Sequence, residues 1–184
     1  MLLDTRTFHA LSPFLERDHL TASHIAREKR LNQKSVSNLL NRLEDEGVLS
    51  STREGRNKLF SVKRNESSVS LLVMLEHEHR ARFFAEHPTI ERIAEALAEH
   101  LDDLSLIFGS QAKGTQTEAS DMDLFVLGTP SDELKRVAKR YGVAITSRRN
   151  LSDTALITQF KHHVILTSAE RYVREVRLRN SDDA

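Results

Sequence analysis

The chain has 184 residues and a formal net charge of zero, because 27 Lys and Arg balance 27 Asp and Glu. It has no cysteine, which excludes disulfides, thiolate zinc sites and cysteine nucleophiles. Residues 1–4 do not open a signal peptide, and no apolar run approaches the ~20 residues of a membrane span, so we expect a soluble cytoplasmic protein without membrane contact.

The charge is unevenly distributed along the chain. Residues 1–66 carry 12 bases and 9 acids, a charge of +3. Residues 67–124 carry 4 bases and 11 acids (−7), and residues 125–184 carry 11 bases and 7 acids (+4). A basic start and an acidic middle indicate an anion-binding front and a candidate metal-binding centre.

Three helices and a hairpin are predicted in the first third of the chain. Apolar side chains recur at helical spacing over residues 4–17, and Thr21 is a candidate N-cap of a second helix. A third helix carries an apolar stripe. It is expected to end at Gly47, because glycine is common directly after the last residue of a helix. The stripe consists of Val36, Leu39, Leu40 and Leu43. Two strands follow, at residues 48–53 and 58–62.

The third helix has the composition of a DNA-reading helix, with one apolar face and short polar or basic groups on the other. The residues predicted to face DNA are Gln33, Lys34, Ser35, Ser37, Asn38, Asn41 and Arg42 on the helix, and Arg53, Arg56 and Lys58 around the hairpin turn. Residues 21–63 resemble the winged helix-turn-helix of MarR- and ArsR-like regulators, which implies double-stranded DNA as partner. A homodimer is expected because a single winged helix makes few phosphate contacts. The alternative is a winged helix that serves protein contact or dimerisation.

From residue 68 to about residue 100 the pattern predicts two helices, broken near Pro88. The first of them, over 69–84, is a candidate dimer surface, though it could equally pack on a second domain. The period then changes to that of a mixed α/β domain. Strands are expected at 104–108, 123–127, 143–147 and 164–166, and helices at 132–141, 151–160 and 169–179. Arg171, Arg174 and Arg177 share one face of the last helix and serve either nucleic-acid binding or solubility.

A Gly-Ser pair followed after ten residues by Asp-x-Asp is the most specific signal in the chain. At a strand-to-helix turn, Gly109 lets the backbone approach a phosphate, and Ser110 donates to the same oxygens. Lys113 is a further candidate phosphate contact.

Asp121 and Asp123 alternate with Met122, so on an extended strand both carboxylates point to one face and can share a metal ion. We expect Met122 and Phe125 to face the opposite side, into the core.

This motif resembles that of the DNA polymerase β-type nucleotidyltransferase superfamily, over residues 101–166. The resemblance implies a nucleoside triphosphate bound with Mg²⁺, a catalytic and metal-binding role for Asp121 and Asp123, and a nucleotide-binding role for Gly109, Ser110 and Lys113. The minimal members of the superfamily include antitoxin partners of HEPN proteins, so a HEPN-type or other protein is a candidate acceptor.

One position departs from that pattern. Members of the superfamily carry a third carboxylate on a later strand, which here is residues 143–147. Ala144 stands where the acid is expected and Thr146 follows two residues later, while Asp153 could substitute only if the backbone turns back. Nucleotide transfer is therefore in doubt.

The predicted organisation has two domains. An N-terminal winged helix-turn-helix DNA-binding domain (1–66) and a helical linker with a dimerisation role (67–100) precede an α/β nucleotidyltransferase-like domain with a mixed sheet (101–184). The predicted function is a DNA-binding transcriptional regulator that binds Mg²⁺ and a nucleoside triphosphate. The alternative is an active nucleotidyltransferase, antitoxin-like, that moves a nucleoside monophosphate, AMP foremost, to a protein or small molecule.

Overall fold

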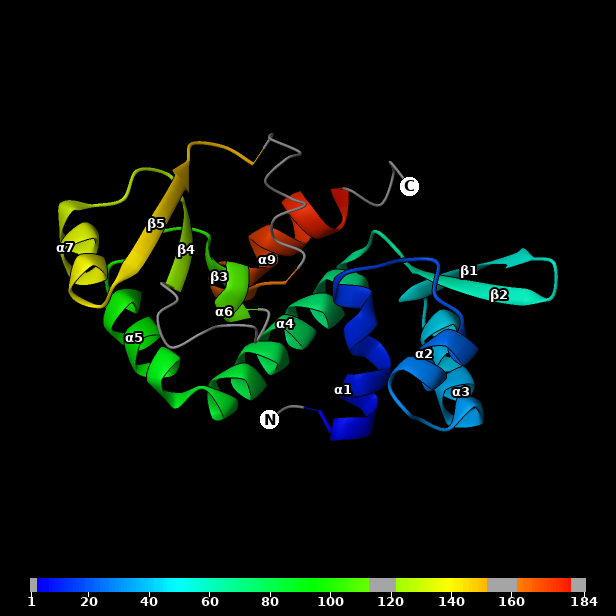
Figure 1. The fold of residues 1–184 in the computed structure, drawn as a ribbon. Coiled ribbons are helices and arrows are strands. Elements are labelled where there is room, and N and C mark those ends of the chain that lie inside the picture. Colours follow the sequence, from blue (N-terminus) through cyan, green and yellow to red (C-terminus); the bar gives the residue numbers. More distant parts are fainter. Residues whose placement is uncertain (1–2, 113–121, 152–161, 180–184) are drawn as a thin grey trace. The chain divides into compact units, whose positions relative to one another are not determined.

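The computed structural model describes residues 3–112, 122–151 and 162–179 (Figure 1). The chain forms two compact units: Met1–Glu78 with Arg177–Ala184, and His79–Val176. The first boundary falls inside helix α4 (Glu66–Glu86), and the second falls inside the π-helix η2 (Val173–Arg177). The functional boundaries proposed from the sequence, near residues 66 and 100, stay predictions.

The first unit begins with α1 (Thr5–Leu11), whose N-cap Asp4 accepts hydrogen bonds from the amides of Arg6 and Thr7. The continuous helix predicted over residues 4–17 is wrong at its end. After Leu11 the chain tightens into a 3₁₀ turn, η1 (Ser12–Leu15), because Pro13 has no N–H to donate to the preceding helical turn.

Two helices follow, and their predicted caps are confirmed. Thr21 Oγ1 accepts the amide of His24 at 3.1 Å and begins α2 (Ala22–Glu28). Helix α3 (Gln33–Asp45) begins after its N-cap Asn32, and Gly47 follows its end with φ +75°. Three of the four stripe residues are buried, whereas Leu39, at the edge of the stripe, is half-exposed.

The hairpin closes the unit. Strands β1 (Leu49–Glu54) and β2 (Asn57–Val62) are antiparallel, as expected, and the turn between them is two residues long. The sequence pattern did not indicate that Leu20 pairs with Phe60, each amide donating to the other's carbonyl at 2.9 Å. Three helices, a short bridge and a hairpin make this unit a winged helix (Figure 1).

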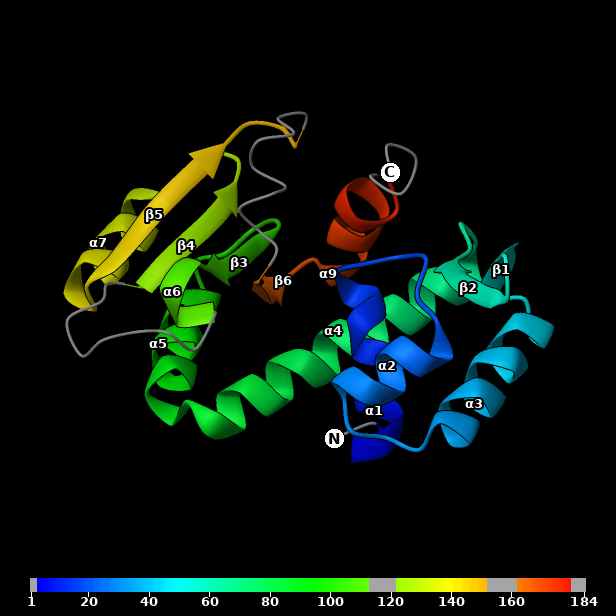
Figure 2. The same ribbon diagram turned by 45° about the vertical axis from the view of Figure 1, so that its right-hand side comes forward.

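The second unit holds a four-stranded mixed sheet in the order β5-β4-β3-β6 (Figure 2). Only β4 and β5 are parallel. The predicted α/β architecture is confirmed, as is the helix break before Pro88. The strands are β3 (Ser105–Phe108), β4 (Met122–Leu127), β5 (Val143–Arg148) and β6 (Val164–Thr167). The described helices are the second part of α4, α5 (Pro88–Ala98), α6 (Gly109–Ala112), α7 (Asp132–Arg140) and α9 (Ala169–Tyr172).

Two predicted helices are not confirmed over their full length. The helix expected over residues 151–160 lies outside the described residues after Leu151. The helix expected over 169–179 is α-helical only to Tyr172, and then continues as the π-helix η2. This wider winding accompanies the burial of three consecutive residues, Val176, Arg177 and Leu178.

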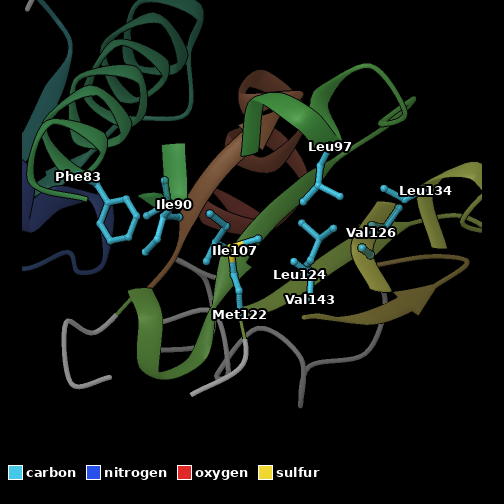
Figure 3. Packing of buried hydrophobic residues seen from close by; sticks show 11 residues of the cluster. Phe83, Ile90, Leu97, Ile107, Met122, Leu124, Val126, Leu134 and Val143 are labelled. Atoms are coloured by element: carbon cyan, nitrogen blue, oxygen red, sulfur yellow. The ribbon is translucent and has the colours of Figure 1, made fainter. Parts of the chain in front are cut away.

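One face of the sheet carries a hydrophobic core with α5 and α7 (Figure 3). Met122, Leu124 and Val126 of β4 pack there, as strand alternation requires. The expectation that Phe125 shares this face with Met122 is wrong, because residues three apart on a strand point to opposite faces. Phe125 is fully buried on the face that carries Asp123.

Candidate functional site

Gly109 and Asp123 lie against each other where β3 ends. In the antiparallel register Phe108 pairs with Asp123, which places the carboxylate beside the first residue of α6. Gly109 has φ +78°, and a Cβ built on it would lie 2.3 Å from Asp123 Oδ2. Glycine therefore serves two purposes here: it allows the left-handed turn, and it leaves room for the carboxylate.

The structure describes three of the five residues predicted for this pocket. Ser110 follows Gly109 in α6 and is half-exposed, as is Asp123. Lys113 and Asp121 lie outside the described residues. The described part of the predicted pocket thus consists of the β3–α6 turn and one half-exposed carboxylate.

The neighbouring strand supplies no acid. In the parallel register of β4 and β5, Asp123 pairs with Ala144 and Phe125 pairs with Thr146. Paired residues on adjacent strands share a face of the sheet, so Ala144 stands directly beside Asp123. Ala144 is exposed, and its methyl group can neither ligate a cation nor accept a proton. Asp153, the other candidate, lies outside the described residues.

Binding of a nucleoside triphosphate, as expected from the sequence, would require a divalent cation. Among the described residues, no cluster of three or more His, Cys, Asp or Glu side chains forms a metal site. Mg²⁺, however, is usually held by one or two carboxylates together with substrate phosphates and water. Asp123, with the space that Gly109 leaves beside its carboxylate, fits such a shared site.

Comparison with known proteins finds a similarity over the residues that carry this site. Residues 90–175 match the family model of the nucleotidyltransferase domain. This part of the chain has the nucleotidyltransferase fold. The match lies within the second compact unit, His79–Val176, and spans all four strands of its sheet.

No curated protein sequence matches the chain. A predicted DNA-binding transcriptional regulator from E. coli is 24% identical, with 40% of this chain and 77% of that chain covered and a TM-score of 0.35. TrmBL2, an archaeal chromatin protein, is 13% identical, with 95% of this chain and 71% of that chain covered and a TM-score of 0.31. The winged helix assignment rests on the elements of the first unit themselves.

Upstream of the nucleotidyltransferase domain, α3 presents a polar face. Its apolar side chains Val36, Leu40 and Leu43 are buried. Of the residues predicted to face DNA, those exposed are Gln33, Lys34, Ser35, Asn38, Arg42, Arg53 and Arg56, and those half-exposed are Ser37, Asn41 and Lys58. The fold thus gathers polar and basic groups along α3 and at the tip of the hairpin.

Lys58 has a structural role that sequence reasoning missed. Its Nζ donates to Asn41 Oδ1 at 2.8 Å and to the carboxylate of Glu44, which ties β2 to α3. The hydrogen bond from Lys58, together with one from Ser51, lowers the pKa of the Glu44 carboxyl. No sequence signal indicates this pairing, because its partners lie 14 and 17 residues from Lys58 and meet only once the hairpin folds back on α3.

The described helices include none that combines the length and apolar character needed to cross a membrane.

Proposed function

We propose that this protein is a DNA-binding transcriptional regulator, acting in the cytoplasm as a homodimer, whose nucleotidyltransferase domain binds a nucleoside triphosphate with Mg²⁺. The observation that carries the proposal is the exposed polar face of α3 on a winged helix, next to a hairpin with Arg53 and Arg56 exposed. A helix of this kind enters the major groove, where Asn and Gln suit adenine edges.

A dimer is proposed because the surface that one winged helix offers to DNA is small. A single winged helix makes few phosphate contacts, and the affinity for DNA grows with the number of phosphates neutralised. Two copies that bind a palindromic operator would double that number. The predicted dimer surface is residues 69–84, which lie within α4.

For the nucleotide, the support is the turn after β3. Gly109 allows the backbone to approach phosphate oxygens, and Ser110 offers a hydroxyl donor. Asp123, with Asp121 as the second ligand expected from the sequence, would hold Mg²⁺, which when bound neutralises the charge of the phosphates. Ala144 beside Asp123 leaves no carboxylate there to accept the proton of an attacking hydroxyl. This first proposal therefore covers binding of the nucleotide and does not include its transfer to an acceptor.

Calorimetric titration tests the nucleotide half of the proposal. ATP, GTP, CTP and UTP are titrated with and without Mg²⁺ into the wild type, Asp123→Ala and Asp121→Ala. We expect binding of at least one triphosphate that requires Mg²⁺ and is lost in both variants, because each variant removes an oxygen ligand. If the wild type binds no triphosphate, the proposed nucleotide binding is contradicted, and only the role as a DNA-binding regulator stays proposed.

A second candidate is an active nucleotidyltransferase that moves AMP or another nucleoside monophosphate onto a HEPN-type protein, another protein or a small molecule. The observation that favours it is the position of the Asp123 carboxylate beside the Gly109 turn, where a Cβ built on Gly109 would lie 2.3 Å from Oδ2. Transfer of label from α-labelled nucleotide to an acceptor, abolished by Asp123→Ala, would establish this function in place of the first.

A further inference from the structure

A groove of about 760 Å³ lies within the winged helix unit, lined by α1, α3 and the turn between α2 and α3. Its volume is in the range of clefts that hold small molecules. Each of these three segments contributes one arginine: Arg6, Arg42 and Arg30, respectively. No Asp or Glu belongs to its described lining. Three guanidinium groups without an acid between them indicate an anion as the occupant.

Arg30 is unusual in its backbone conformation. It has φ +53°, and the amide of the next residue, Leu31, donates to the Ala26 carbonyl at 2.8 Å. This is the hydrogen bond of a Schellman turn, in which the left-handed position is ordinarily glycine or asparagine. An arginine there strains the backbone, and strain of this kind gathers at functional positions.

The charge of Arg30 is also uncompensated. Arg30 is exposed, and none of the described carboxylates forms an ion pair with it. Arg17, in the same unit, contrasts with it, since its Nη2 lies 2.6 Å from Glu28 Oε2. The turn that ends α2 thus places in the groove lining an arginine that no described carboxylate pairs with, and its guanidinium can meet an anion there.

The other groups of the groove suit the same ligand. Arg42 Nε lies 3.7 Å from Glu46 Oε1, an exposed pair that compensates its charge only weakly. Asn32 Oδ1 accepts the amide of Ser35 at 3.0 Å, so its own amide nitrogen is the group left to donate to an anion. Guanidinium and amide donors together match the oxygens of a phosphate.

We propose that this groove binds a phosphate group through Arg30, Arg6 and Arg42. The phosphate comes either from the backbone of duplex DNA or from a free phosphorylated molecule such as a nucleotide. The first source rests on the proposed function, because α3, the proposed reading helix, is one wall of the groove. Arg6, Arg30 and Asn32 then join the DNA-facing surface, although none of them is in the set predicted from the sequence.

The decisive variant is Arg30→Gly in the full-length chain. Glycine removes the guanidinium and is at ease at φ +53°, so the variant should unfold in urea at the same or a higher concentration than wild type. Arg27→Ala is the matched control, because it removes one exposed charge from α2 outside the groove. Binding of a short mixed-sequence duplex is measured by fluorescence anisotropy over a range of salt concentrations. Binding of ATP or inorganic phosphate is measured by calorimetry in an Asp123→Ala background.

If the phosphate is that of DNA, Arg30→Gly weakens duplex binding about fivefold and lowers the slope of log affinity against log salt by about 0.9, while Arg27→Ala does not. If the phosphate is free, duplex binding is unchanged, but ATP or phosphate binding in the Asp123→Ala background is lost. Equal binding of every probe by Arg30→Gly and wild type would overturn the proposal. A wild type that binds no duplex refutes the proposed function instead, and the ATP and phosphate titrations then decide the groove alone.

Discussion

Gly109 is constrained both by its own backbone and by the side chain opposite. Its φ of +78° disfavours any Cβ, and the added atom would also meet Asp123 Oδ2. The second constraint is separable from the first, because Gly128 has φ +101° with nothing within 4 Å of a built Cβ. The two glycines therefore form a matched pair.

We predict that Gly109→Ala lowers the free energy of unfolding by roughly 1–3 kcal/mol from backbone strain, and displaces the Asp123 carboxylate as well. Gly128→Ala should show a similar loss of stability and no loss of nucleotide binding. Urea denaturation and calorimetric titration of both variants measure the two effects. Nucleotide binding that is equally weak in both variants would show that the contact with Asp123 does not matter.

Glu28 is the residue at which stability should depend on pH. A hydrogen bond from Arg17, helped by Lys29, lowers the pKa of its carboxyl from 4.5 to about 2. A carboxyl with a depressed pKa contributes stability above its unfolded pKa and loses it as the pH falls through the folded one.

We expect Glu28→Gln to destabilise the first unit by about 1 kcal/mol at neutral pH, the upper limit for solvent-accessible ion pairs. The difference from wild type should shrink as the pH falls from about 4.5 to about 2. Thermal unfolding followed across that window measures it. A difference that persists at the lowest pH would mean that the amide disturbs packing and not charge.

At the scale of elements, Arg177, the last residue of η2, belongs to the first unit and binds residues of that unit. Its guanidinium lies 2.9 Å from Asp18 Oδ2 and donates to the carbonyls of Phe14 and Arg17. Asp18 also accepts the amide of Val62 in β2 at 2.8 Å. The arginine face predicted to bind nucleic acid or aid solubility is thus occupied by ion pairs, since Arg171 pairs with Asp103 and Arg174 pairs with Glu170.

Removal of Arg177 should be costly, because the Asp18 side chain, which is only 9% exposed, would keep its charge without the cation. We predict that Arg177→Met lowers the free energy of unfolding by about 3–5 kcal/mol, and that the double variant Arg177→Met with Asp18→Asn recovers part of the loss. Urea denaturation of the single and double variants measures the coupling. Simple additivity of the two single effects would contradict the pairing.

For the whole molecule, the two candidate sites belong to different compact units. The exposed polar residues of α3 and the hairpin lie in the first unit, and Gly109 and Asp123 lie in the second. Each site is built from contacts within its own unit, so the two proposed activities should be separable by mutation.

We therefore expect Arg56→Ala to weaken DNA binding at all sequences alike and to lower its salt slope by about 1, with nucleotide binding unchanged. Asp123→Ala should do the reverse. Anisotropy on duplexes of different sequence and calorimetry with triphosphates check both variants. Loss of both activities in either variant would contradict the assignment of one site to each unit.

The sequence alone determined most elements of this protein, because the signals that end helices and turns act within a few residues. Thr21, Gly47 and Pro88 mark helix ends through their own hydrogen bonds or ring geometry, and the structure confirms all three. The spacing of Gly109-Ser110 and Asp121-x-Asp123 likewise indicated the nucleotidyltransferase fold, which the family match over residues 90–175 supports.

Only the tertiary structure decided which of these residues meet. The antiparallel register of β3 and β4 brings Asp123 onto Gly109, and the parallel register of β4 and β5 brings Ala144 beside it. Two further interactions join segments that meet only in the folded unit. They are the hydrogen bonds from Lys58 to Asn41 and Glu44, and the ion pair of Arg177 with Asp18. Register and helix packing are set by the burial of a whole core, so no local stretch of sequence carries them.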